Sequence, residues 1–347
     1  MPSPTCPPAF RTGTARFSRR QLLLGGTAAL LELPGLAGAA NAATAAPAAA
    51  RQKIASRLRI VIPANAGGGW DQTGRALGEA LLASGAADAV DYENMGGKGG
   101  TIGLAHYVQQ YGSQPDTLLI GGMVMAGAIA LQKPAVDLSA VQPLARLTSD
   151  YIVVAVPKDS PIRSAKDLTA ALRSDPRSLT MAGGSAGSVD HMFAGLLIRA
   201  AKAAPDQLSY LPFAGGKDVV NALLQGKAQL GLSGYSEFSE ALRSGQLRAI
   251  GISSRRSVFG LPTFKEQGVD ADMANWRAVF TGKGVSAARA QELLQAVEQA
   301  TLQESWLRAL RSNRWDSALQ SGKDLREFLE LEQTTASVMT YLLKLKS

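Results

Sequence analysis

The chain has 347 residues, of which 46% are hydrophobic and 18% charged, and its formal net charge is +8 at pH 7. Its basic residues are scattered along the sequence and form no stripe, which argues against nucleic-acid binding. The single cysteine, Cys6, lies near the N-terminus, so the remainder of the chain has no disulfide and no cysteine metal site.

The N-terminal segment has the pattern of a secretory signal. The pair Arg19-Arg20 directly precedes the apolar run 22–31, and Ala40-Asn41-Ala42 offers a cleavage site. The run is too short to span a membrane, which takes about 20 residues, and the paired arginines resemble a twin-arginine export signal. We therefore expect a signal peptide over residues 1–42, a disordered linker over 43–56 and a periplasmic location.

The next part of the chain alternates between strand-like and helix-like segments. Residues 57–62 predict a strand, which runs into a glycine turn over 63–71 and then into an amphipathic helix. Residues 89–92 and 117–121 predict two further strands, with a helix between them that ends near Tyr111. This alternation predicts a parallel sheet flanked by helices.

A second group of α/β elements follows. Residues 151–156 predict a strand that carries the chain into a second domain, and the chain returns to the first domain after Ser253. We expect two doubly wound α/β domains joined by a two-strand hinge. The first domain covers 57–150 and 254–347, the second covers 151–253, and a long amphipathic helix ends the chain from about Lys323.

Three glycine turns, at 63–71, 183–188 and 213–218, each connect a strand to a helix. A helix N-terminus has unpaired N–H groups and attracts anions, and glycine lets a ligand approach these groups closely. Tight turns are also ordinary in α/β proteins. Three in one chain, one of them with two hydroxyl side chains, favour a cleft between two domains that closes on an anion.

An enzyme interpretation rests on Ser185. Residues 183–187 fit the G-x-S-x-G turn of serine hydrolases, which also need a distant downstream histidine. The chain has only His106 and His191, and His191 follows Ser185 by six residues. A secreted serine hydrolase is therefore a disfavoured alternative, and with two histidines we expect no metal and no cofactor.

Six segments follow one another in an order that is specific as a set. They are 66–71 with Arg75, 94–97 with 99–103, 158–161 with 166–168, 184–188, 213–216 and 261–268. This ordered set resembles the periplasmic substrate-binding proteins of tripartite tricarboxylate transporters, also called Bug proteins. The resemblance covers essentially the whole chain after the signal.

The resemblance implies a hinged, two-domain binding protein of the periplasmic-binding-protein type (type II) without catalytic activity. Such a protein delivers a carboxylate to a permease with a large and a small membrane subunit, and we expect it to be a monomer. An alternative with the same fold is a sensor that presents its solute to a membrane signalling partner.

The resemblance also implies that one loop from each domain holds the carboxylate with backbone amides and small hydroxyls. The expected ligand-binding residues are Asn65, Ala66, Gly67, Gly68, Trp70, Met123, Val124, Ser185, Ala186, Gly187, Ser188, Gly215, Gly216 and Tyr235. One of the two serines could instead only cap its helix. Asp71, Arg75 and Asp190 are expected to shape the loops, and Arg277 is a candidate from its position alone.

Trp70 bears on the identity of the ligand. Many members of the Bug family have Thr or Ser directly before the aspartate of the first loop, where this chain has Trp70. An aromatic residue at this position resembles the citrate-binding branch. This favours citrate or another tricarboxylate.

Overall fold

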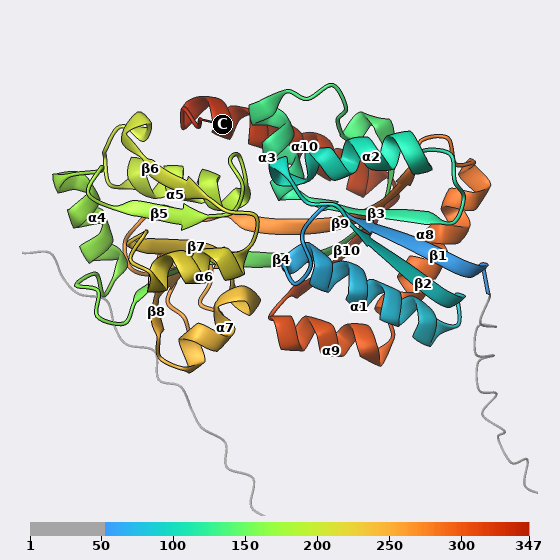
Figure 1. Ribbon diagram of the computed structural model, residues 1–347, viewed down its shortest axis with the longest axis horizontal. Coiled ribbons are helices and arrows are strands. Elements are labelled where there is room, and N and C mark those ends of the chain that lie inside the picture. The colour runs from blue at the N-terminus through green and yellow to red at the C-terminus, as the bar shows by residue number, and fades with distance from the viewer. Residues whose placement is uncertain (1–52, 347) are drawn as a thin grey trace, which may run out of the picture. The chain divides into compact units, whose positions relative to one another are not determined.

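The computed structural model describes residues 53–346 as a mixed α/β fold (Figure 1). The expected signal peptide over 1–42, with its twin-arginine motif, lies outside the described residues, and so does most of the linker expected over 43–56. The last two residues of that linker, Ala55 and Ser56, belong to the first strand. Among residues 53–346, no helix combines the length and the apolar character that a membrane crossing needs.

The first lobe is built on five paired strands and a sixth that joins their edge. Its strands are β1 (Ala55–Ile62), β2 (Ala87–Asn94), β3 (Thr117–Gly122), β9 (Ala274–Gly282), the first part of β4 (Val141–Pro157) and β10 (Asp316–Ser321). Their order is β2-β1-β3-β9-β4, and β10 also pairs with β4. The parallel pairing of β1 with β2 and β3 confirms the predicted parallel sheet. The antiparallel pairing of β9 and β10 was not predicted.

Helices cover both faces of this sheet, with α2, α3 and α10 on one side and α1 and α9 on the other (Figure 1). The helices are α1 (Gly69–Ser84), α2 (Thr101–Tyr111), α3 (Met123–Gln132), α8 (Ala287–Thr301), α9 (Glu304–Asn313) and α10 (Gly322–Leu342). Helix α8 packs against α1. All six residues of β3 are buried, as expected for a strand covered on both faces.

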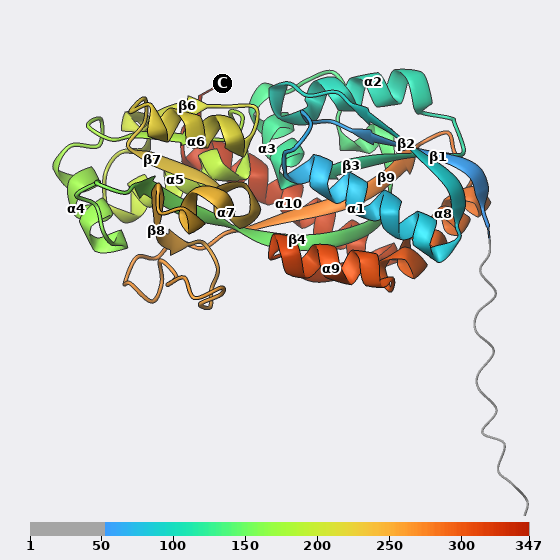
Figure 2. The ribbon, with the colours of Figure 1, turned by 60° about the horizontal axis from the view of Figure 1, so that its bottom comes forward.

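The second lobe repeats this arrangement with a smaller sheet in the order β4-β7-β5-β6, to which β8 adds by pairing with β4. Its elements are β5 (Thr180–Gly183), β6 (Ser209–Pro212), β7 (Leu230–Gly234), β8 (Leu247–Ile252), α4 (Ala165–Ser174), α5 (Val189–Ala200), α6 (Gly216–Leu224) and α7 (Tyr235–Arg243). Short 3-10 turns occupy Lys98–Gly100, Leu138–Ala140 and Pro205–Gln207. Figure 2 shows α6 and α7 beside the sheet of this lobe.

Strand β4 belongs to both lobes. Residues 141–151 of this 17-residue strand pair with β9, and residues 152–157 pair with β7 and β8. The chain returns to the first lobe through residues 253–273, which lead into β9. The expected fold class, two α/β halves joined by two crossings, is therefore confirmed, although only 151–156 of β4 was recognised as a strand.

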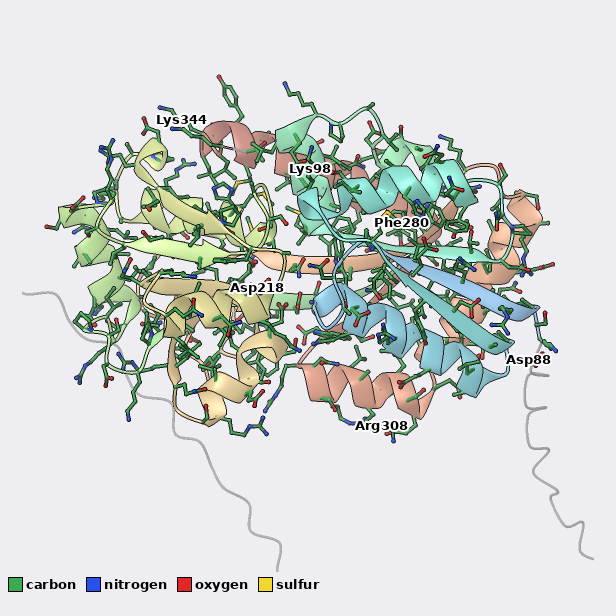
Figure 3. All side chains as sticks on the ribbon, in the orientation of Figure 1. Asp88, Lys98, Asp218, Phe280, Arg308 and Lys344 are labelled. Carbon is green, nitrogen blue, oxygen red and sulfur yellow. The ribbon has the colours of Figure 1, made fainter. Side chains whose placement is uncertain are left out.

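The hydrophobic core continues from one lobe into the other. Ile62 and Phe280 of the first lobe and Phe193 of the second belong to one cluster of buried side chains (Phe280 is labelled in Figure 3). Leu343, directly after α10, lies against Gly195 of α5, where an added Cβ would come within 2.9 Å of it. Packing of Leu343 on α5 thus joins the lobes away from their two connections, β4 and residues 253–273.

Candidate functional site

A cavity of about 110 Å³ lies between the two lobes. One buried water needs roughly 10–15 Å³, so this cavity has room for a small solute. Both lobes contribute to its wall, and the first lobe does so partly through β9. Its lining residues are Pro63, Ala64, Asn65, Gly68, Gly69, Trp70, Gly96, Gly97, Gly99, Gly100, Val124, Gly184, Ser185, Val189, Asp190, Ala214, Gly215, Gly216, Ser233, Gly234, Glu237, Asn275 and Arg277.

Three helix N-termini converge on this cavity. Helices α1, α6 and α7 begin after Gly68, Gly215 and Gly234, and none of these residues offers a side chain to cap its helix. All three glycines line the cavity. The first N–H groups of a helix lack partners within the helix and carry the positive end of its dipole. The cavity is therefore suited to an anionic group.

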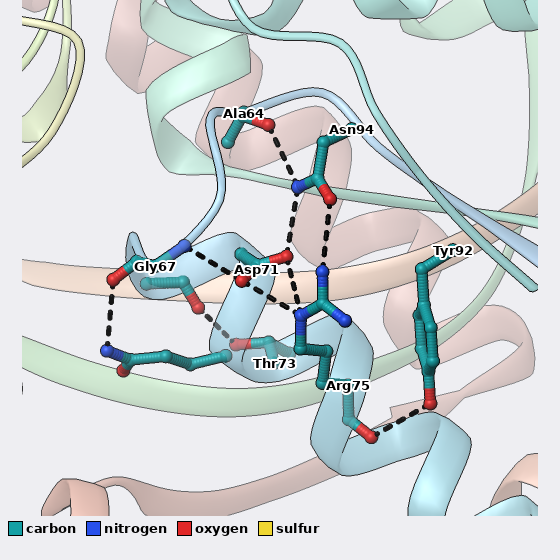
Figure 4. Close-up of polar contacts among 9 residues, drawn as sticks. Ala64, Gly67, Asp71, Thr73, Arg75, Tyr92 and Asn94 are labelled. Carbon is teal, nitrogen blue, oxygen red and sulfur yellow. Dashed lines mark hydrogen bonds and ion pairs between the residues drawn. The ribbon is translucent and has the colours of Figure 1, made fainter.

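Asp71 holds the first glycine loop in place (Figure 4). Its carboxylate accepts hydrogen bonds from the N–H of Gly67 at 2.8 Å, from Nε of Arg75 at 3.0 Å and from Nδ2 of Asn94 at 2.9 Å. Burial alone would raise the pKa of Asp71, but the hydrogen bonds from Arg75, Gly67 and Asn94 bring the pKa below its usual value. Asp71 and Arg75 thus shape the loop, and the N–H of Gly67 is occupied by Asp71.

The second glycine loop divides the roles of its two serines. Ser185 lines the cavity, whereas the buried Ser188 caps α5, with its Oγ accepting a hydrogen bond from the N–H of His191 at 3.3 Å. Nδ1 of His191 accepts a hydrogen bond from Gly187, and its ring stacks on Tyr210 with centroids 4.0 Å apart. His191 is thereby engaged away from Ser185, which removes the base that the hydrolase alternative requires.

The expected ligand-binding residues fall into two groups. Those that line the cavity are Asn65, Gly68, Trp70, Val124, Ser185, Gly215 and Gly216, together with Asp190, which was expected to shape its loop. Those outside the lining are Ala66, Gly67, Met123, Ala186, Gly187, Ser188 and Tyr235. Met123 is buried and borders a second hollow, and Tyr235 lies under the guanidinium of Arg314 in another.

Several lining residues were not predicted from the sequence. Glu237, in the first turn of α7, accepts hydrogen bonds from the N–H of Gly216 at 3.1 Å and from the hydroxyl of Ser233 at 2.5 Å. It thereby ties the N-termini of α6 and α7 together. Asn275 of β9 and the glycines 96, 97, 99 and 100 complete the wall. An acidic residue three positions after Gly234 is a signal that could have drawn attention to Glu237.

A buried ion pair supports the floor of the cavity. Arg277 donates to Oδ2 of Asp150 at 2.5 Å and to Oγ1 of Thr73 at 3.1 Å, and the Arg277 and Asp150 side chains are 3% and 5% exposed. The guanidinium also lies over the ring of Trp315 at 4.6 Å. Burial raises the pKa of Asp150 to about 6 despite the opposing attraction of Arg277.

Two further ionisable groups near the cavity are shifted by burial. Burial raises the pKa of Asp190 to about 8, against the lowering effect of a hydrogen bond from the N–H of Gly184 at 2.9 Å. The negative charges of Glu237 and Asp150 raise this pKa further. Burial also lowers the pKa of His191 to about 4. At pH 7 Asp190 is therefore mostly protonated and His191 is neutral.

These shifts predict how stability depends on pH. The pKa of Asp190 is higher in the folded protein than in an unfolded chain, so the folded state holds an extra proton that it loses as the pH rises through 8. The lowered pKa of His191 changes stability in the opposite direction, but mainly below about pH 6.5, where an unfolded chain takes up a proton at this residue. The raised pKa of Asp150 affects stability only up to about pH 6. Between pH 6.5 and 8, the free energy of unfolding should fall by at most about 1.4 kcal/mol per pH unit.

Urea unfolding at pH 6.5, 7.0, 7.5 and 8.0 measures this slope, which Asp190→Asn should remove. The matched control is Asp218→Asn, which removes an exposed carboxylate from the first turn of α6 (Figure 3) and should keep the slope. Equal slopes in the wild type and Asp190→Asn would assign the proton to another group.

The family described as tripartite tricarboxylate transporter family receptor matches residues 77–339. A UPF0065 protein of Agrobacterium vitis, from the TAR-I ttuE-ttuC' intergenic region, is 24% identical over 256 residues, which are 71% of either chain.

Two solved structures have the same fold. The periplasmic binding protein BugD gives a TM-score of 0.75 at 19% identity, and R. palustris Rpa4515 with adipate gives 0.76 at 21%. Each match covers 84% of this chain and 98% of the other. The chain belongs to the tripartite tricarboxylate transporter receptor family, as the resemblance to Bug proteins predicted.

Proposed function

We propose that this protein is a periplasmic receptor that captures a small carboxylate between its two lobes and delivers it to the membrane subunits of a tripartite tricarboxylate transporter. The observation that carries this proposal is the convergence of three helix N-termini, each of which begins after a glycine, on one cavity lined by both lobes. Members of its family are receptors, and the chain is not an enzyme.

In this proposal the carboxylate lies against the N-termini of α1 and α6, where Gly68 and Gly215 leave room for its oxygens. The hydroxyl of Ser185 donates from the second lobe. The proposed domains are 57–150 with 254–347 and 151–253, and the exchange of pairing partners in β4 between Tyr151 and Ile152 supports a boundary at this point. A hinge here would let the lobes separate to admit the solute.

A structural neighbour and Trp70 bear on the nature of the solute. The structural neighbour Rpa4515 was solved with adipate, a dicarboxylate. Citrate, which Trp70 favours, stays a prediction for this chain. Trp70 lines the cavity but is 6% exposed, and its ring packs so closely on Gly100 that an added Cβ would lie 2.6 Å away. Most of the Trp70 side chain is thus covered within the first lobe, and little of it is open to a ligand.

A thermal-shift screen tests the proposal with citrate, tricarballylate, succinate, malate, adipate, glutamate and nicotinate. A ligand present at 100 times its Kd should add about 2.7 kcal/mol to the free energy of unfolding. Equimolar sodium chloride controls for ionic strength. A complete lack of shift with all seven acids would contradict the carboxylate assignment.

Gly215→Val should weaken binding of the acid that gives the largest shift by about tenfold or more, since it fills the space where the carboxylate is expected. The backbone of Gly215 is extended, and no atom lies within 4 Å of its Cβ position. The substitution should therefore leave the melting temperature of the ligand-free protein nearly unchanged. Isothermal titration of both proteins with that acid measures the effect, and equal affinities would place the carboxylate elsewhere.

A further inference from the structure

The cavity between the lobes is more acidic than a site for a simple anion requires. Its ionisable lining residues are Asp190, Glu237 and Arg277. The charge of Arg277 is balanced by its buried ion pair with Asp150. Two carboxyl groups, those of Asp190 and Glu237, therefore remain beside three helix ends that attract anions.

Neither of these two carboxyl groups has a cationic partner within the described residues 53–346. Asp190 accepts a hydrogen bond from the N–H of Gly184, and Glu237 accepts from Gly216 and Ser233. A carboxylate offers about four acceptor positions. Each group therefore keeps acceptor capacity for a donor that enters the cavity.

A further oxygen acceptor on the cavity lining lacks a hydrogen-bond donor in the described part of the chain. It is Oδ1 of Asn275, a side chain of β9. Close by, Oδ2 of Asp150, which accepts from Arg277, comes within 3.3 Å of the Cβ position of Gly234 on the cavity wall. Buried acceptors are almost always paired in folded proteins. The unpaired acceptor on the lining points to a ligand that donates hydrogen bonds.

We propose that the solute carries a protonated nitrogen as well as a carboxylate, and that Glu237 and Asp190 hold this nitrogen while the carboxylate lies against the helix N-termini. The proposal rests on the receptor function proposed above and names the class of its solute. A tricarboxylate would instead bring up to three negative charges next to Glu237, and the cation on the lining, Arg277, is already paired with Asp150.

Proton release on binding follows from this arrangement. Asp190, with a pKa of about 8, is mostly protonated at pH 7, and a cationic nitrogen beside it favours the ionised form. The charged and titratable groups that face Asp190 are Glu237 of α7, Asp150 of β4, Arg277 of β9 and Tyr210 of β6. Binding at pH 7 should therefore release up to one proton from Asp190.

The test compares acids that differ only by an amino group. Isothermal titration at pH 7 uses L-glutamate against glutarate, L-aspartate against succinate and 4-aminobutyrate against butyrate, with citrate alongside. In at least one pair the amino acid should bind about tenfold or more tighter than its deaminated partner, as expected for a charge-assisted hydrogen bond. Titration in phosphate and in Tris, which differ in heat of ionisation, counts the protons released.

Two variants assign the effect to its residues. Glu237→Gln should reduce the preference for the amino group by about tenfold, whereas Glu240→Gln, on the exposed part of the same helix, should retain it. Asp190→Asn should abolish proton release, whereas Asp218→Asn should not. Because asparagine and glutamine keep an acceptor oxygen, the bonds from Gly184 and Gly216 can persist, and circular dichroism confirms folding.

The outcomes separate this proposal from the receptor function. Equal or tighter binding of the deaminated acids or citrate would overturn the amino-group proposal and leave the carboxylate receptor standing. Binding of no acid at all would overturn both. A preference for the amino acids that survives in Glu237→Gln, with unchanged proton release in Asp190→Asn, would show that other groups hold the nitrogen.

Discussion

Replacing Arg277 with methionine should lower the free energy of unfolding by about 3–5 kcal/mol, because it leaves Asp150 buried without its counter-ion. The two side chains are almost fully buried and meet at 2.5 Å. Burial already raises the pKa of Asp150 to about 6 with Arg277 present, so its removal should raise that pKa further. The protonated carboxyl tolerates burial better, so the loss should be larger at pH 8 than at pH 5. Urea unfolding at both pH values measures it.

Two controls separate the lost charge pair from a general loss of packing. The double replacement of Arg277 by methionine and Asp150 by asparagine should recover part of the stability, because no buried charge is then left unpaired. Arg57→Met removes a guanidinium from an exposed pair with Asp91 on neighbouring strands, which should cost no more than about 1 kcal/mol. If Arg277→Met costs no more than Arg57→Met, the ion pair does not support the floor of the cavity.

The fold could be predicted wherever the pattern of the chain is local. The three strand–glycine–helix units at 63–71, 183–188 and 213–218 were predicted because the turn and the apolar helix face lie within a few residues. The first ten residues of β4 were not, since Pro143 and several polar residues interrupt its apolar pattern. Helix α3 was not recognised because its sequence is apolar on all sides and shows no period.

The candidate site, like the fold, could be predicted only where its pattern is local in the sequence. Gly68, Ser185 and Gly215 were proposed because anion attraction by a helix N-terminus depends only on the turn itself. On the acidic side of the cavity, Asp190 was predicted only to shape its loop and Arg277 was named from its position alone, whereas Glu237 and Asp150 were not predicted. Asp150 and Arg277 are 127 positions apart, and only the pairing of β4 with β9 brings them together. Polar residues that meet through long-range strand pairing leave no local signal in a single sequence.

Gly127→Val should weaken binding of the carboxylate that gives the largest thermal shift by about 5- to 150-fold, because it forces the lobes apart next to the cavity. Gly127 lies in α3 of the first lobe, and an added Cβ would come within 2.1 Å of the backbone oxygen of Gly187 in the second. Gly187 has a φ of +81°, and its own Cβ position is 2.8 Å from the oxygen of Gly127. Two backbones in such contact cannot admit a side chain without moving. Val124 and Ser185, on the same two segments, line the cavity and would move with them.

The matched control is Gly78→Val, in the interior of α1. Its Cβ would also come within 2.1 Å of an atom, but that atom is the hydroxyl of Tyr92 on a side chain of the same lobe. Overpacking of this kind costs about 1–3 kcal/mol. Gly78→Val should therefore lower the melting temperature while leaving the affinity of the folded protein unchanged. Small-angle X-ray scattering without ligand should show a larger radius of gyration for Gly127→Val than for the wild type, whereas the radius of Gly78→Val should equal that of the wild type. If both the radius of gyration and the affinity of Gly127→Val were unchanged, close contact between Gly127 and Gly187 would not be needed for capture of the solute.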